Sequence, residues 1–128
     1  MSRPIATQGD RVVATDTHLV VPEAGGPPVP MALPFDGELD ADLSPDVLAE
    51  HRPVALEGSL AHQSPGHIVT PKSFARPPAN RARVVVGAPT VLANHRPVAR
   101  SGDLAETCND PVDLPIGAVV ATGTVVSG

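Results

Sequence analysis

Large aromatic residues are almost absent from this 128-residue chain, which has two phenylalanines and neither tyrosine nor tryptophan. Aromatic side chains supply the large burial units of most cores, so the core here must be a thin one of valine, alanine and leucine. The chain also lacks the aromatic platforms on which single-stranded nucleic acids stack. Its nine basic residues are scattered and outnumbered by fourteen acidic ones, which argues against any nucleic-acid partner.

Cysteine is equally scarce. Cys108 is the only one, so no internal disulfide can compensate for the thin core, whereas a structural metal can. Residues 1–6 lack the apolar stretch of a secretory signal, and no apolar run approaches transmembrane length. We therefore expect a protein without stable membrane anchoring that is synthesised and assembled in the cytoplasm.

Proline and glycine are abundant, with 16 and 11 residues, and the prolines recur too often for long helices. Short valine-rich runs, typical of strands, occur at 12–14, 18–21, 83–86 and 118–126. We interpret the Pro/Gly-rich segments 22–43 and 70–80 as long loops. The chain is therefore expected to be a single all-β domain, 1–128. Its expected parts are hairpin units at about 9–21, 46–60 and 84–104, and a closing strand at 117–126.

A repeat relates residues 46–61 to residues 90–105, with a constant offset of 44. Such a repeat indicates one supersecondary unit used more than once. Each copy is typical of a β-hairpin, which in the second copy turns at Asn94-His95. A two-residue type I′ turn requires positive φ at both central positions, and asparagine and histidine are among the residues that tolerate it.

Residues 87–104 resemble the PAAR family, which is named for a Pro-Ala-Ala-Arg repeat. The likeness is carried by the lead-in 87–92, the tetrad Pro97-Val98-Ala99-Arg100, the corner Gly102-Asp103, and the segments 33–39 and 58–68. It extends over roughly residues 9–128. The first copy departs from the pattern, because Leu56 stands where the family has arginine, and the N-terminal unit has no such tetrad.

This resemblance implies a small pointed cone of short β-hairpins that caps a homotrimeric, VgrG-like spike. Such spikes belong to contractile injection systems, among them type VI secretion systems and phage-tail-like particles. One copy of the chain would sit on each trimer, sharpen it for envelope piercing and be delivered outward with the particle. The resemblance also implies a structural zinc ion near the apex, held by three histidines and one cysteine, and no catalytic residues.

Five histidines and Cys108 are available as ligands. His51 and His95 occupy equivalent hairpin turns, where a conformational role is the simpler explanation. The four that remain follow Gly-Asp or Gly-Ser corners within ten residues and match the implied pattern: His18, His62, His67 and Cys108. His51 or His95 is the substitute if one of these is not a ligand. Zinc is the expected ion, although iron or another ion fits the same ligands.

Two other functions stay open at this point. The chain could be an adaptor that links a separate effector or toxin to the spike. It could also be a small zinc metalloenzyme, which needs an open coordination position and a general base. No acidic residue has an obvious placement as that base, although Glu106 stays open because it lies two residues from Cys108. Four protein ligands leave no open position, so the sequence favours a structural protein over an enzyme.

Overall fold

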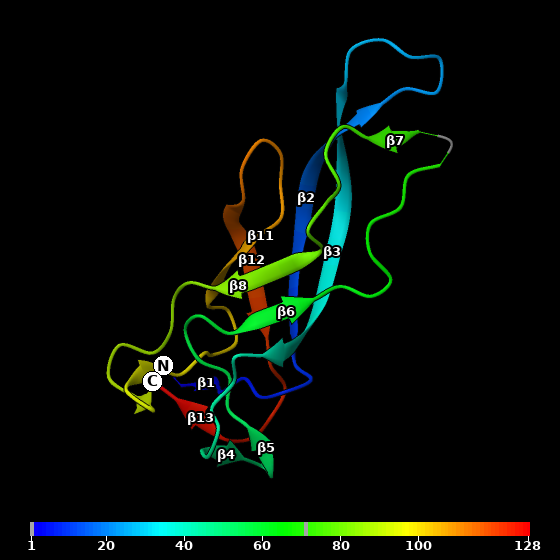
Figure 1. Cartoon of the computed structure of the whole chain (residues 1–128). Helices are drawn as coiled ribbons and strands as arrows, with labels where there is room; N and C mark the ends of the chain where they lie inside the picture. The colour runs from blue at the N-terminus through cyan, green and yellow to red at the C-terminus, as the bar shows by residue number, and fades with distance from the viewer. Residues whose placement is uncertain (1, 71) are drawn as a thin grey trace.

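The computed structural model describes residues 2–70 and 72–128, so Met1 and Pro71, the latter in the expected loop 70–80, lie outside the described residues (Figure 1). Within those residues the chain forms thirteen strands and no helix, which confirms the all-β fold class. The described residues accordingly offer no helix that could cross a membrane. The strands are β1 Arg3–Pro4, β2 Arg11–Val21, β3 Val29–Ala41, β4 Leu48–Ala49, β5 Arg52–Pro53, β6 Leu60–His62, β7 Ser73–Phe74, β8 Arg81–Val84, β9 Leu92–Ala93, β10 Arg96–Pro97, β11 Leu104–Thr107, β12 Leu114–Val120 and β13 Val126–Ser127.

Six strands close into a small barrel in the order β12-β11-β8-β6-β3-β2, because β12 pairs again with β2. All six pairings are antiparallel. The barrel consists of three strand pairs, β2–β3, β6–β8 and β11–β12, placed side by side. The short strand β7 adds to the far end of β2. Closure suits a chain with a thin core, because each barrel strand gains two hydrogen-bonded neighbours.

The prediction of a loop over 22–43 is wrong, because most of this segment is the 13-residue strand β3. Strand β3 pairs with β2 over ten successive positions, so β2 is a single strand instead of a hairpin within 9–21. The Asp36 N–H points away from β2, to the side chain of Gln63. Pro30 and Pro34 are an even number of residues from Asp36, so their backbone nitrogens also face away from β2. The ladder with β2 therefore loses no hydrogen bond at either proline. The closing strand expected at 117–126 is divided between β12 and β13.

Three segments at the broad end of the molecule, 3–10, 52–59 and 96–103, are related by an internal threefold symmetry. Their alanines form a closed ring of backbone hydrogen bonds of 2.9 Å: Ala6 N to Ala99 O, Ala55 N to Ala6 O, and Ala99 N to Ala55 O. A second ring, of 2.8–2.9 Å, joins Gln8 N to Pro53 O, Glu57 N to Pro97 O, and Ser101 N to Pro4 O. The N-terminal Arg3-Pro4-Ile5-Ala6 is therefore a third copy of the repeat, which sequence analysis missed.

Each proline-containing strand of this ring has an antiparallel partner: β5 pairs with β4, β10 with β9, and β1 with β13. The predicted turns are confirmed, because φ is positive at Glu50 (50°) and His51 (68°) and again at Asn94 (53°) and His95 (67°). In the N-terminal unit the partner strand of β1 is β13, from the other end of the chain. Arg100 fixes that strand's end, because its Nη1 donates to the Gly128 carbonyl at 2.7 Å.

The corner glycines of the three copies, Gly9, Gly58 and Gly102, have φ of 92°, 97° and 88°. An L-residue with a side chain is strained there. In each case the arginine of a neighbouring copy covers the corner. Its guanidinium lies 3.7 Å (Arg52), 3.0 Å (Arg96) or 3.1 Å (Arg3) from the position that a Cβ atom would occupy.

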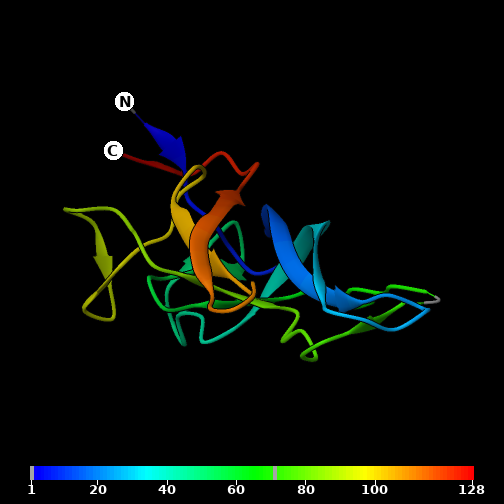
Figure 2. The same cartoon turned by 90° about the horizontal axis from the view of Figure 1, so that it is seen from above.

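Mostly small side chains of alanine and valine form the core inside the barrel, above this ring. Phe35 is the largest side chain in that core. The molecule tapers away from the broad end, where both termini lie, toward the projecting β2–β3 hairpin (Figures 1 and 2). The fold is therefore a pointed all-β body with a threefold base and one long hairpin at the narrow end.

Candidate metal centre

Two polar side chains of β2 point into the barrel. Along this strand Val12, Asp16, His18 and Val20 are buried, whereas Val13, Thr15 and Thr17 are exposed. Successive side chains of a strand alternate between its two faces, so Asp16 and His18 share the inner face with the core valines.

The other donors come from the remaining two units of the barrel. His67 lies in the loop between β6 and β7, and Cys108 directly follows β11. His18 and His67 each stand nine residues after a corner glycine, Gly9 and Gly58, as the numbering shows. Each of the three units therefore contributes at least one donor to the same place.

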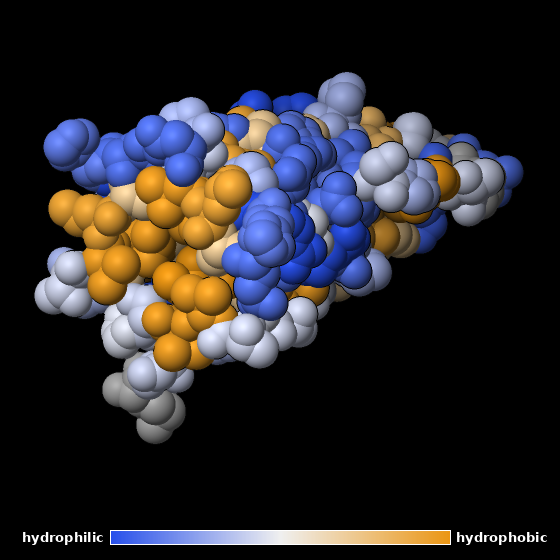
Figure 3. All heavy atoms as spheres, turned by 90° about the horizontal axis from the view of Figure 1, so that it is seen from below, coloured by the Kyte–Doolittle hydropathy of each residue, from blue (hydrophilic) through white to orange (hydrophobic). Residues whose placement is uncertain are grey.

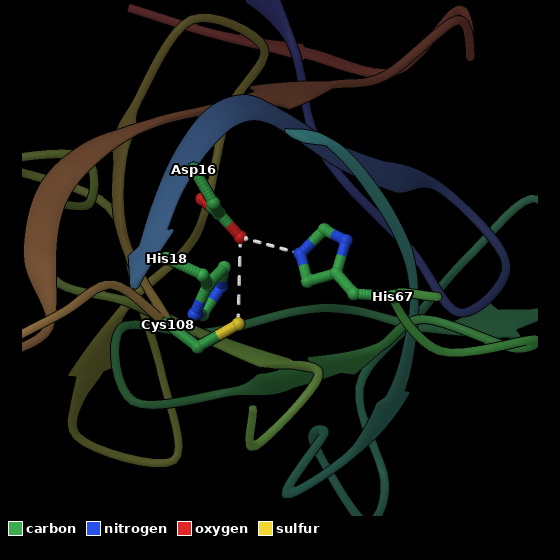
Figure 4. A group of neighbouring side chains, drawn as sticks. All are labelled: Asp16, His18, His67 and Cys108. Carbon is green, nitrogen blue, oxygen red and sulfur yellow. Dashed lines mark hydrogen bonds and ion pairs between the residues drawn. The ribbon is translucent and has the colours of Figure 1, made fainter. Parts of the chain in front are cut away.

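The four donor atoms lie within 4.8 Å of one another (Figure 4). The His67 Nε2 is 3.1 Å and the Cys108 Sγ is 3.4 Å from the same oxygen of Asp16, Oδ2. All four side chains are at most 2% exposed. Ligand atoms of a tetrahedral zinc ion lie about 3.3–3.8 Å apart, given its bond lengths, so a small contraction would bring this cluster to metal-binding geometry.

The buried ring of His18 is a second, independent observation that fits a metal ion at this cluster. Neither of its ring nitrogens has a hydrogen-bond partner among the residues that the structure describes, although the side chain is 1% exposed. An unsatisfied buried polar atom costs about 1–3 kcal/mol. A metal ion would satisfy one of these nitrogens, so the residues present fit a metal.

Asp16 is held in position by its neighbours. The Thr107 hydroxyl donates to Asp16 Oδ1 at 2.5 Å, which leaves Oδ2 directed at His67 and Cys108. Asn109 in turn donates to Thr107 through its amide nitrogen and accepts from the Thr17 N–H at 2.7 Å. This network fixes the orientation of the Asp16 carboxylate, as outer-shell hydrogen bonds fix the ligands at metal sites.

Electrostatics around the cluster follow from burial. Burial lowers the pKa of His18, as does the neighbouring His67, so its imidazole is neutral and able to coordinate near neutral pH. Burial, with the Asp16 carboxylate beside it, raises the pKa of the Cys108 thiol to about 11. Without a metal the thiol therefore keeps its proton at neutral pH, and a metal ion would displace that proton on binding.

Three of the four ligands expected from the sequence, His18, His67 and Cys108, lie together in this cluster. The fourth, His62, does not. His62 is on β6, where alternation buries Ala61 and turns the histidine outward. Its side chain is 43% exposed, and its Nδ1 lies 2.6 Å from Asp40 Oδ1. The substitutes His51 and His95 are exposed at the turns of the broad end.

Sequence reasoning missed Asp16, which takes the place expected for His62. The available signal was its position two residues before His18 in a valine-rich strand, because alternation puts both on one face. Glu106, considered as a general base, points away from the cluster. It is on the outer face of β11, between the buried Ala105 and Thr107, and pairs with Arg83 at 3.6 Å.

Comparison with protein-family models, with curated proteins and with solved structures gives no match. The fold and the cluster therefore carry the functional argument. The buried set of Asp16, His18, His67 and Cys108 could hold a metal ion, and it joins the three units of the barrel at the opposite end from the alanine ring.

Proposed function

We propose that this protein is the tip of a contractile injection spike and that one copy caps the end of a homotrimeric, VgrG-like partner. The observation that carries the proposal is the threefold base, in which Ala6, Ala55 and Ala99 close a ring of 2.9 Å hydrogen bonds. A single chain ordinarily presents one asymmetric surface to a partner. This base presents three equivalent edges, which suits contact with three identical subunits around one axis.

Exposed aliphatic side chains follow the same symmetry. They occur as three equivalent pairs, one per unit, with exposures of 36–59%: Val47-Leu48, Val91-Leu92 and Val125-Val126. The second member of each pair stands opposite the proline of its unit, Pro53, Pro97 or Pro4. Hydrophobic atoms gather at the broad end in Figure 3, and apolar patches of this kind mark interaction surfaces.

The metal centre has a mechanical role in this proposal. A core of alanine and valine gives little cohesion, and the narrow end carries the load when a spike strikes an envelope. An ion held by two histidines, one cysteine and one aspartate would cross-link the three units there. Zinc is the ion we propose, because it accepts this mixed donor set in tetrahedral geometry. Four protein ligands leave no open position for substrate, in keeping with a structural function.

Binding to a trimeric VgrG-like spike, measured by native mass spectrometry, tests the proposal. We expect a complex of one chain with three spike subunits. The triple variant Leu48→Glu, Leu92→Glu, Val126→Glu should abolish the complex, because it places a charge on each apolar edge. A single replacement should weaken it.

The matched control is Ile116→Glu, which changes an exposed aliphatic residue on the wall of the barrel (48% exposed). It should bind as the unaltered protein does. A complex of three chains per trimer, or a triple variant that still binds, would contradict the proposal.

A further inference from the structure

The two unpartnered nitrogens of His18 need two different partners, and the metal proposed above accounts for only one. The search for the second leads to Asp110, two residues after Cys108. Its Oδ2 lies 3.5 Å from His18 Nδ1, and both side chains are buried, at 4% and 1% exposure. A shift of about half an ångström would turn this approach into a hydrogen bond of ordinary length.

We propose that Asp110 is a positioning residue for the metal centre: it accepts a hydrogen bond from His18 Nδ1–H and thereby leaves His18 Nε2 for the metal. Metal-bound histidines commonly donate their second ring N–H to a carboxylate, which fixes the tautomer and the ring orientation. The inference rests on the proposed metal site, and it assigns a role to a residue that contributes no metal ligand.

Asp110 is itself anchored from two directions, which a positioning residue requires. Its Oδ2 accepts the Leu19 N–H at 2.8 Å, and its own N–H donates to the Thr17 carbonyl at 2.9 Å. The carboxylate is therefore tied to the strand that carries His18, at the residues on either side of it. Any movement of His18 relative to Asp110 would have to break this local register.

Arg76 holds the other oxygen of the carboxylate. Its Nη2 lies 2.8 Å from Asp110 Oδ1 and 2.7 Å from the Asn109 carbonyl oxygen. The arginine and the following residues 77–79 line a cavity of about 220 Å³ whose other walls include His18 and Cys108. Arg76 thus occupies the solvent side of the carboxylate and keeps Oδ2 turned toward the imidazole.

The test compares zinc affinity, by competition with a chelator, in Asp110→Asn and in the control Asp113→Asn. Asp113 lines the same cavity, so the two variants remove the same charge close to the same site. We expect Asp110→Asn to weaken zinc binding about tenfold or more and Asp113→Asn to leave it unchanged. Arg76→Gln, which loosens Asp110 without removing it, should have a smaller effect.

The tautomer of His18 gives a second readout that needs no variant and that a merely structural role would not fix. Nitrogen-15 NMR of the zinc-loaded protein should show His18 protonated at Nδ1 and coordinated through Nε2. Coordination through Nδ1, or equal affinities of the two aspartate variants, would overturn the assignment while the metal site stands. Failure of the unaltered protein to bind zinc would overturn both.

Discussion

Three units of the chain meet at both ends of the molecule, but the contacts between them differ at the two ends. At the broad end the units are nearly identical, and main-chain hydrogen bonds join them around Ala6, Ala55 and Ala99. At the narrow end the units differ in length and structure, so equivalent backbone contacts cannot recur there. Side chains from all three units meet there: Asp16 and His18 from the first unit, His67 from the second and Cys108 from the third.

The repeated backbone structure is therefore confined to the broad end of this fold, and the clustered donor side chains lie at the narrow end. The base depends on small residues and glycine corners, so it tolerates few changes of volume. The narrow end has four buried donor atoms, which we propose hold one metal ion. Substitutions should therefore affect the two ends of the molecule unequally.

Replacing Ala99 with leucine should break the base. Ala99 is fully buried beside Ala6 and Ala55, so the larger side chain must push the ring apart. We expect a loss of about 3 kcal/mol or more of unfolding free energy, at the upper end of overpacking costs. Urea unfolding measures it. Ala32→Leu, at an exposed position of β3, is the control and should be nearly neutral, and equal losses in both would contradict the role of the ring.

Removing the thiol should loosen the narrow end and spare the base. Cys108→Ser should lose bound metal, and with it the linkage stabilisation of about 4 kcal/mol that applies when free metal exceeds the dissociation constant a thousandfold. Hydrogen exchange should quicken around β2 and the His67 loop, whereas the amide of Ala55 stays protected. Uniform quickening over both ends would show that the ends are not independent.

The metal-free protein should have a stability window whose two limits follow from the shifted pKa values of His18 and Cys108. The pKa of His18 is lowered from 6.5, so stability falls as pH drops below that value and the histidine must be charged. The pKa of Cys108 is raised from 9.0 to about 11, so stability is full below pH 9 and falls as pH rises to 11. The thiol's share is at most about 2–3 kcal/mol.

Urea unfolding of chelator-treated protein between pH 5 and 11 checks this window. Cys108→Ala should lose the alkaline decline and keep the acidic one, because the raised pKa of the thiol causes the alkaline decline. An alkaline decline that persists unchanged in this variant would assign it to other groups.

Replacing His62 should have the smallest effect. The residue is half-exposed and pairs with Asp40 at the surface, and such pairs contribute less than about 1 kcal/mol. We expect His62→Ala to keep its metal and to unfold within about 1 kcal/mol of the unaltered protein. A loss of metal in His62→Ala, measured by elemental analysis against His67→Ala as the positive control, would restore His62 as a ligand.

The sequence predicted the all-β fold, the hairpin turns at His51 and His95, and three members of the buried cluster. These signals are local: valine runs, an ungapped repeat and residues that follow glycine corners. The third copy at Arg3-Pro4 was missed because it lies 49 residues before the next copy, outside the offset of 44, and its partner strand comes from the other end of the chain. Only tertiary closure reveals that unit.

Most of segment 22–43 forms strand β3 instead of the expected loop, because the backbone pairing with β2 outweighs the preference of its prolines and glycines for loops. Prolines are compatible with a strand where their missing donors face outward, as at Pro30 and Pro34. Sequence analysis missed Asp16 because an aspartate in a strand becomes a candidate ligand only when its side chain is known to face the core. The side on which His62 points likewise depends on barrel register, which the repeat alone does not define.

We propose that one ion held by Asp16, His18, His67 and Cys108 joins the three units at the narrow end. X-ray absorption at the zinc edge, on protein loaded with one equivalent of zinc, tests it most directly. We expect one sulfur ligand at about 2.3 Å and three nitrogen or oxygen ligands at about 2.0–2.2 Å. A spectrum without sulfur, or one typical of zinc coordinated by water alone, would contradict it.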